Sequence, residues 1–170
     1  ASSDSTVFVE LKKKYDSVVY KRRIALPERQ AMDWVTGKTS CCKHTQISAE
    51  IDYFIQYYET LHPVVFLSYA REAYFAKDHS DFRVTFDDTI LFRQFDLSLQ
   101  SAAYGTPLLP EGKVLMELKC SGGIPLWMAH FLSSEQIYKT SFSKYGTAYK
   151  NHIFCQLVRQ REQQALPIQE

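Results

Sequence analysis

Residues 8–15 read FVELKKKY, and residues 18–23 read VVYKRR. The alternation of apolar and charged residues is typical of β-strands, whose successive side chains point to opposite faces. In the first stretch, Glu10, Lys12 and Lys14 would therefore share one face. The two stretches, separated by a short turn, predict a β-hairpin with one charged face.

The same alternation recurs further along the chain. In the predicted strand at residues 114–120, Glu117 and Lys119 share one face while Val114, Met116 and Leu118 pack on the other. Arg71 and Arg83 are likewise flanked by apolar residues in predicted strands. A half-exposed sheet whose polar face meets water would explain any one of these strands. A barrel interior lined by lysine, arginine and glutamate explains them together.

Such an interior would be unfavourable when empty, because like charges would crowd in a medium of low dielectric. At ~4 Å and an effective dielectric near 20, each pair of like charges interacts by roughly 4 kcal/mol. Several phosphate groups and a divalent metal ion would offset that repulsion. A charged tunnel therefore implies an anionic ligand.

The remaining elements predict an antiparallel α+β domain. Asp87 and Asp88 are expected to form a turn between two of the strands, and no glycine-rich phosphate loop is present. The connections between the predicted strands resemble hairpins, which favours an antiparallel sheet over a doubly wound one. The predicted strands are residues 7–14, 18–26, 64–75, 82–86, 89–99 and 114–120, and the predicted helices are 28–35, 47–61, 124–132 and 144–164.

Composition narrows the class of protein. Hydrophobic residues make up 45% of the 170 residues, which excludes a disordered chain. Twenty lysine and arginine residues against nineteen acidic ones argue against a wholly basic nucleic-acid binder. No apolar run approaches the roughly 20 residues of a membrane helix. Four cysteines without metal-ligand spacing predict reduced thiols in a cytoplasmic protein.

Five segments together resemble one known family. They are residues 8–15 and 18–23, residues 69–74 (YAREAY) with 83–87 (RVTFD), residues 114–119 (VLMELK) and residues 141–145 (SFSKY). In this order they are similar to the vacuolar transporter chaperone (VTC) domain, a polyphosphate polymerase domain of the triphosphate tunnel metalloenzymes. The resemblance runs from residue 8 to about residue 149. It implies an α+β fold with an antiparallel β-tunnel, or barrel, and flanking helices.

The resemblance also implies roles for individual residues. Glu117 would hold a divalent metal, and the hard oxygen ligands indicate Mg²⁺ or Mn²⁺. Arg93 is a weaker phosphate-binding candidate, because the predicted Asp87–Asp88 turn does not fix its register. No catalytic nucleophile is implied, since phosphoryl transfer would proceed by positioning and charge neutralisation. The implied phosphate ligands are Lys12, Lys21, Arg23, Arg71, Arg83, Lys119, Ser143 and Lys144.

The chain departs from the family at its start. The family opens with a glutamate-rich strand and a further basic strand, and neither precedes residue 8. Residues 1–170 are therefore expected to be one domain, the C-terminal two-thirds of the tunnel. The implied partners are polyphosphate or a nucleoside triphosphate, the N-terminal segment of the same protein and an unidentified membrane protein, with no specific nucleic acid. A tunnel triphosphatase, a non-catalytic polyanion sensor and RNA binding by the basic hairpin remain alternatives.

Overall fold

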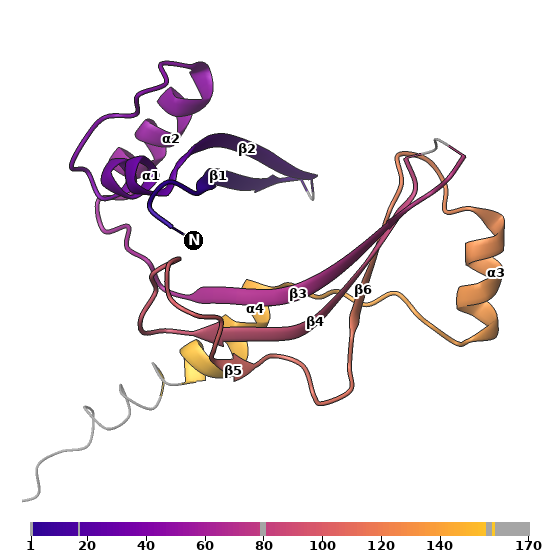
Figure 1. Cartoon of the computed structure of the whole chain (residues 1–170). Helices are drawn as coiled ribbons and strands as arrows, with labels where there is room; N and C mark the ends of the chain where they lie inside the picture. Colours follow the sequence, from indigo (N-terminus) through magenta and orange to yellow (C-terminus); the bar gives the residue numbers. More distant parts are fainter. Residues whose placement is uncertain (1, 17, 79–80, 156–157, 159–170) are drawn as a thin grey trace, which may run out of the picture. The chain divides into compact units, whose positions relative to one another are not determined.

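The computed structural model describes residues 2–16, 18–78, 81–155 and 158 (Figure 1). The chain divides into two compact units. The first unit is formed by residues 1–64 and 97–102, and the second by residues 65–96 and 103–170. Each unit builds its own antiparallel sheet, so the prediction of an antiparallel α+β chain is confirmed.

The first unit begins with the predicted hairpin. Strand β1 (Thr6–Tyr15) pairs antiparallel with β2 (Val18–Pro27) without a break in register. Asp16 takes a positive φ of 46° in the connecting turn, a conformation that short polar side chains tolerate. The register brings Lys12 opposite Lys21, which fixes the faces of both strands.

Two helices cover the apolar face of this hairpin. Helix α1 (Glu28–Val35) has the predicted bounds and is followed by Gly37, whose φ of 74° suits a helix C-terminus. Helix α2 (Gln46–Tyr57) ends earlier than the predicted 47–61. A capping box between Thr45 and Ser48 satisfies its first backbone donors.

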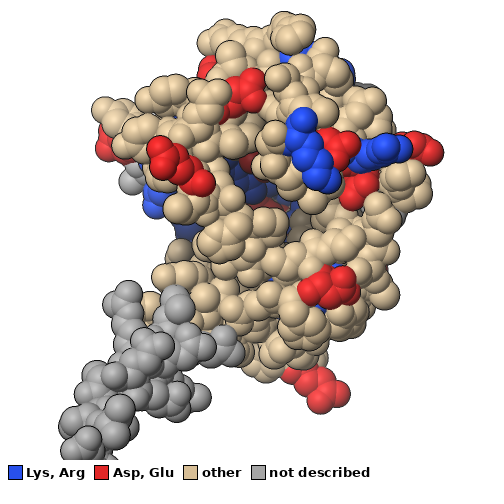
Figure 2. All heavy atoms as spheres, turned by 90° about the vertical axis from the view of Figure 1, so that its left-hand side faces the viewer, with Lys and Arg blue, Asp and Glu red and all other residues tan. Residues whose placement is uncertain are grey.

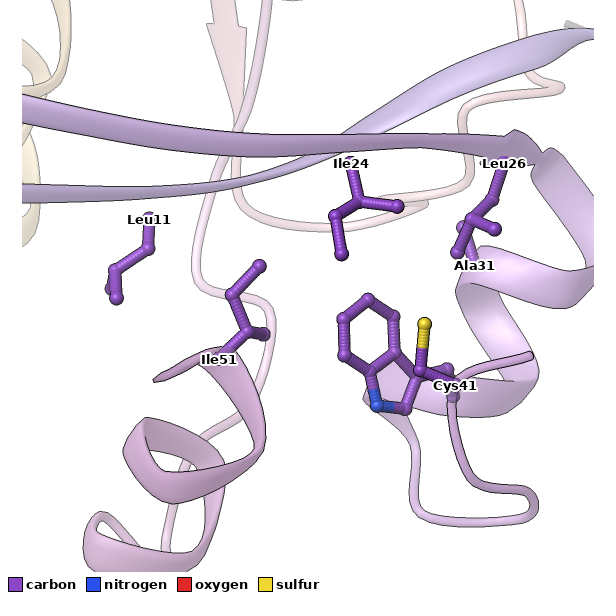
Figure 3. Packing of buried hydrophobic residues seen from close by; sticks show 7 residues of the cluster. Leu11, Ile24, Leu26, Ala31, Cys41 and Ile51 are labelled. Carbon is purple, nitrogen blue, oxygen red and sulfur yellow. The ribbon is translucent and has the colours of Figure 1, made fainter. Parts of the chain in front are cut away.

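The core of the first unit lies between the hairpin and these helices. Figure 3 shows Leu11 and Ile24 pointing from the strands toward the side on which Ile51 of α2 lies, and Leu26 pointing toward Ala31 of α1. Trp34 of α1 is 3% exposed, and its Nε1 donates a hydrogen bond of 2.6 Å to an Asp52 oxygen. Each large apolar side chain buried in this way stabilises the fold by about 1.5–3 kcal/mol.

The second unit is built around one long central strand. Strand β4 (Arg83–Arg93) pairs with β3 (Phe66–Phe75) along one edge. Its other edge pairs with the short β5 (Thr106–Pro107), which the sequence did not predict, and with β6 (Leu115–Lys119). All of these pairings are antiparallel.

The apolar face of this sheet packs against helix α3 (Leu126–Ser134), which Figure 1 shows at one end of the strands. Val84 and Met128 are buried in the same cluster, and Met116 and Leu118 of β6 pack against it. The predicted alternation in β6 is therefore confirmed, with apolar residues on the α3 side. Pro125 immediately precedes the helix, where its missing N–H costs no hydrogen bond.

The predicted turn at Asp87 and Asp88 is wrong, because β4 continues through both residues. Asp87 pairs with Arg71 of β3, so a charged residue that is typical of turns is stabilised within the ladder by a cross-strand partner. The irregularity lies two residues later. Thr89 has a φ of 46°, and the register shifts between Ser68 and Ala70 on the paired strand, as in a β-bulge.

The C-terminal part contains α4 (Lys144–Ala148), followed by the π-helix η1 (Tyr149–Ile153). The predicted helix at 144–164 is confirmed at its start, and much of its second half lies outside the described residues. Among those described, the strands form two open antiparallel sheets and no closed barrel. No helix within the same residues has the length and apolar character that crossing a membrane requires.

Candidate functional site: two charged sheet faces

The hairpin places five charged residues on one side. We call this side the charged hairpin face, formed by Glu10, Lys12, Lys14, Lys21 and Arg23. Lys21 Nζ lies 2.5 Å from one Glu10 carboxylate oxygen, and Lys12 Nζ lies 3.3 Å from the other. Partial burial opposes ionisation of Glu10, but these bonds from Lys21 and Lys12 outweigh it and lower its pKa. The predicted shared face of Glu10, Lys12 and Lys14 is confirmed, and the register adds Lys21 and Arg23 to it.

Arg23 has a different neighbour on the same face. Its guanidinium lies over the ring of Phe8, 4.5 Å from the centroid. Stacking of this kind holds the arginine head while leaving its N–H donors available. The hairpin thus presents cations that are already oriented, with one carboxylate between two of them.

The second unit carries a larger cluster on one face of its sheet. Directly paired residues of neighbouring strands point to the same side. The pairs Arg71–Asp87, Thr85–Glu117 and Arg83–Lys119 therefore lie on one face. We call it the charged face, formed by Arg71, Arg83, Asp87, Glu117 and Lys119.

Asp87 is the centre of this charged face. Its side chain is fully buried and accepts two hydrogen bonds from Arg71, from Nε at 2.5 Å and from Nη2 at 2.7 Å. Lys144 Nζ adds a third contact, 2.6 Å from Oδ2. The Arg71 hydrogen bonds lower the pKa of Asp87 against the effect of burial, and Lys144 contributes in the same direction. The same carboxylate raises the pKa of Arg71.

The start of α4 positions Lys144 beside Asp87. Ser143 precedes the helix, and its Oγ accepts a hydrogen bond of 3.1 Å from the Gly146 N–H. Tyr69 lies beside both cations, with its ring centroid 5.0 Å from the Arg71 guanidinium and 4.4 Å from Lys144 Nζ. Ser143 therefore fixes the start of α4, and the tyrosine ring supports the two cations that Asp87 binds.

Glu117 lies on β6 opposite Thr85, with 42% of its side chain exposed. Its carboxylate is 3.0 Å from Lys119 Nζ and 3.8 Å from Arg71 Nη2. The described residues contain no group of three histidine, cysteine or acidic side chains arranged to hold a metal ion. Glu117 offers an exposed carboxylate on this face, and carboxylate oxygens suit a hard cation such as Mg²⁺.

A cavity of about 1140 Å³ runs along β6 within the second unit. Arg83, Glu117 and Lys119 line it, and residues 137–140 form part of its lining too. Lys139 adds a further cation to that lining. The cavity therefore brings three of the predicted site residues to a space large enough for a ligand.

Arg93, the weaker candidate, is placed elsewhere. The extra residue at the bulge moves it to the face opposite Asp87, where its side chain is 1% exposed. Its guanidinium lies 3.7 Å from the centroid of the Phe66 ring and donates to the backbone oxygens of Asp96 and Tyr104. These contacts indicate that Arg93 stabilises the fold around the end of β4.

The structure thus groups the predicted residues into two sets, one for each unit. That Lys21, Arg23, Arg83 and Lys119 line one tunnel interior, as the predicted barrel would require, stays a prediction. On the face drawn in Figure 2, basic and acidic side chains lie beside one another, and the contacts of Glu10, Asp87 and Glu117 give the same picture. Sequence reasoning missed Asp87, although it alternates with Arg83 and Thr85 along one strand.

Fold and site together define an α+β domain whose antiparallel sheets carry clustered cations on their polar faces. The family model for the VTC domain matches residues 1–153. The chain therefore belongs to the VTC domain family, which is related to the polyphosphate polymerases. Among curated proteins, none matches the chain.

Proposed function

We propose that this chain forms the phosphate-binding part of a polyphosphate polymerase, in which a basic tunnel holds polyphosphate or a nucleoside triphosphate. The observation that carries the proposal is the charged face, where Arg71 and Lys144 meet at the buried Asp87. Membership of the VTC domain family supports the same function. The chemistry is transfer of a nucleotide γ-phosphoryl group to a growing polyphosphate end, assisted by a divalent metal ion.

The proposed arginine and lysine ligands bind phosphate in different ways. Arginine can bind a phosphate through two parallel N–H donors, whereas lysine acts as a point charge. Transfer of this kind needs little covalent chemistry from the protein, because positioning and charge neutralisation lower the barrier. The proposed ligands are Lys12, Lys21, Arg23, Arg71, Arg83, Lys119, Ser143 and Lys144.

Glu117 is the proposed metal-binding residue. It is a partly exposed carboxylate on the same face of its sheet as Arg71, Arg83 and Lys119. Glu117 would hold Mg²⁺ or Mn²⁺, and the ion would supply positive charge that neutralises the transferred group. Lys119 and Arg71, which contact Glu117 now, would then be available to the phosphate chain.

A tunnel requires more strands than the described residues supply. In this part of the chain, β6 pairs only with β4 and β3 pairs only with β4, so each has an edge without a partner strand. Open edges of this kind are unfavourable unless another segment covers them. We propose that the N-terminal segment of the same protein supplies the covering strands and closes the tunnel.

The decisive experiment incubates the full-length protein with ATP and Mn²⁺ and separates polyphosphate from orthophosphate. Formation of polymer is the expected result. Orthophosphate without polymer would select the triphosphatase instead, and binding of polyphosphate without turnover would select a polyanion sensor. RNA binding that depends steeply on salt and is not competed by polyphosphate would favour RNA binding by the basic hairpin instead.

Replacing Glu117 by glutamine should weaken Mn²⁺ binding about tenfold or more, because the carboxylate charge is the main protein contribution to the metal. The fold should change little, since both ion pairs of Glu117 are solvent-accessible and such pairs contribute about 0–1 kcal/mol. Titration of Mn²⁺ in the presence of tripolyphosphate measures the effect.

Glu72→Gln is the matched control for this substitution. Glu72 pairs with Phe86, so it lies on the opposite face of the same sheet. Its variant should bind Mn²⁺ as the wild type does. Equal metal affinity in the Glu117→Gln variant and the control would remove Glu117 from the site.

A further inference from the structure

Asp87 joins two elements that are distant in the sequence. Arg71 comes from β3 and Lys144 from α4, and both cations bind the same carboxylate oxygen, Oδ2, at 2.7 and 2.6 Å. A side chain with no exposed surface cannot itself contact a ligand in solvent. The side chain of Arg71, by contrast, is 34% exposed and that of Lys144 18% exposed. Asp87 therefore lies behind the two cations.

Two cations this close together would repel each other without the carboxylate between them. Long side chains also lose rotamer freedom, worth up to about 2 kcal/mol each, when a ligand fixes them. A carboxylate that already holds both heads removes that cost from the binding step, which is the general benefit of preorganisation. The Tyr69 ring beside both heads restricts them further.

We propose that Asp87 is a positioning residue of the phosphate site, which fixes Arg71 and Lys144 as one preorganised receptor for neighbouring phosphate groups. This inference rests on the proposed function. Asp87 does not touch the phosphate chain and acts through the two cations. The bidentate contact to Arg71 fixes the plane of the guanidinium, and the contact to Lys144 fixes α4 against the sheet.

The proposal and simple charge counting predict opposite results. Removing a carboxylate makes the site more positive, so charge counting alone predicts tighter binding of a polyanion. Positioning predicts weaker binding, because the two cations lose their common anchor. The depressed pKa of Asp87 agrees with a carboxylate that stays ionised throughout the neutral range.

The test compares Asp87→Asn with Asp88→Asn. The two residues are adjacent, and the substitutions change charge equally, but Asp88 is exposed and pairs with Ala70 on the opposite face. Binding of tripolyphosphate is measured by calorimetry in the full-length protein without metal. Asp87→Asn should weaken binding about tenfold, and Asp88→Asn by less than about twofold. Equal or tighter binding in Asp87→Asn would overturn the proposal.

A second measurement does not depend on the variant folding. In the wild type, NMR follows the Arg71 Nε–H proton, which Asp87 accepts. The signal should remain protected from exchange both without and with tripolyphosphate, because the ligand binds the cations while Asp87 still holds them. Loss of protection when the ligand binds would contradict a positioning role.

Different results would overturn the proposed function and the positioning role of Asp87. Absence of tripolyphosphate binding in the wild type overturns the proposed function, and with it the positioning role. Normal binding in the wild type together with an insensitive Asp87→Asn variant overturns only the positioning role.

Discussion

Replacing Arg71 by methionine should lower the free energy of unfolding by about 2–3 kcal/mol at pH 7. The substitution leaves the fully buried Asp87 with Lys144 as its remaining cation. Breaking a buried ion pair typically costs about 3–5 kcal/mol, and the smaller figure reflects the remaining lysine and the partial exposure of Arg71. Urea denaturation of the full-length protein measures the difference.

The loss of stability in the Arg71→Met variant should depend on pH. Asp87 has a pKa below its ordinary value of 3.8 in the fold, so its ionisation stabilises the fold above that value. That stabilisation disappears as the pH falls through the folded pKa. Removing Arg71 raises the pKa of Asp87, so the deficit of the variant should be largest near neutral pH and shrink below about pH 4. A deficit that does not change between pH 7 and pH 3.5 would contradict this account.

Arg83→Met is the control for the same measurement. Arg83 lies on the same face of the same strand pair, and its Nε has no hydrogen-bond partner among the residues that the structure describes. Its guanidinium lies 5.7 Å from the centroid of the Phe75 ring, a contact worth about 0.5–1 kcal/mol. The control should therefore lose less than about 1 kcal/mol and show no comparable dependence on pH.

The largest effect on stability is expected from Trp34→Ala, about 3–5 kcal/mol. The indole packs among Leu11, Ile24 and Ile51, so its removal leaves a cavity between the hairpin and both helices of the first unit. The substitution also removes the Nε1 donor that Asp52 accepts from. Chemical denaturation and the loss of buried-tryptophan fluorescence report this change.

The second tryptophan of the chain provides the matched control. Trp127 is 63% exposed, and its ring meets Phe82 edge to face at 6.0 Å. Trp127→Ala should cost about 1 kcal/mol or less, since little apolar area leaves the core. Trp34→Phe separates packing from the hydrogen bond, because it keeps most of the ring but lacks the donor. Equal losses for Trp34→Ala and Trp127→Ala would show that the first core is not as described.

The elements that local patterns define were predicted well. The hairpin follows from charge alternation at residues 8–15, and α1 lies between Pro27 and Gly37, two residues with restricted or unusual backbone preferences. The face shared by Lys12, Lys21 and Arg23 followed from the period of a strand once the pairing was fixed. Each of these features depends on residues close in sequence.

The centre of the charged face could not be predicted in this way. An Asp–Asp pair is typical of turns, and the interior position of Asp87 depends on Arg71, sixteen residues earlier, and on Lys144, fifty-seven residues later. The face on which Arg93 lies could not be predicted for a related reason. The bulge at Thr89 adds one residue to β4, and a shift of one residue moves every later side chain to the other face.

The sequence by itself therefore determined the antiparallel α+β class, the charged faces of individual strands and the resemblance to the VTC domain, because strand periodicity and motif order are local properties. The tertiary structure decided which charges meet. Burial of Asp87 between β3 and α4 converts a residue typical of turns into the carboxylate that organises two cations. That outcome depends on long-range pairing, and a low-dielectric position strengthens it only after the sheet and α4 have come together.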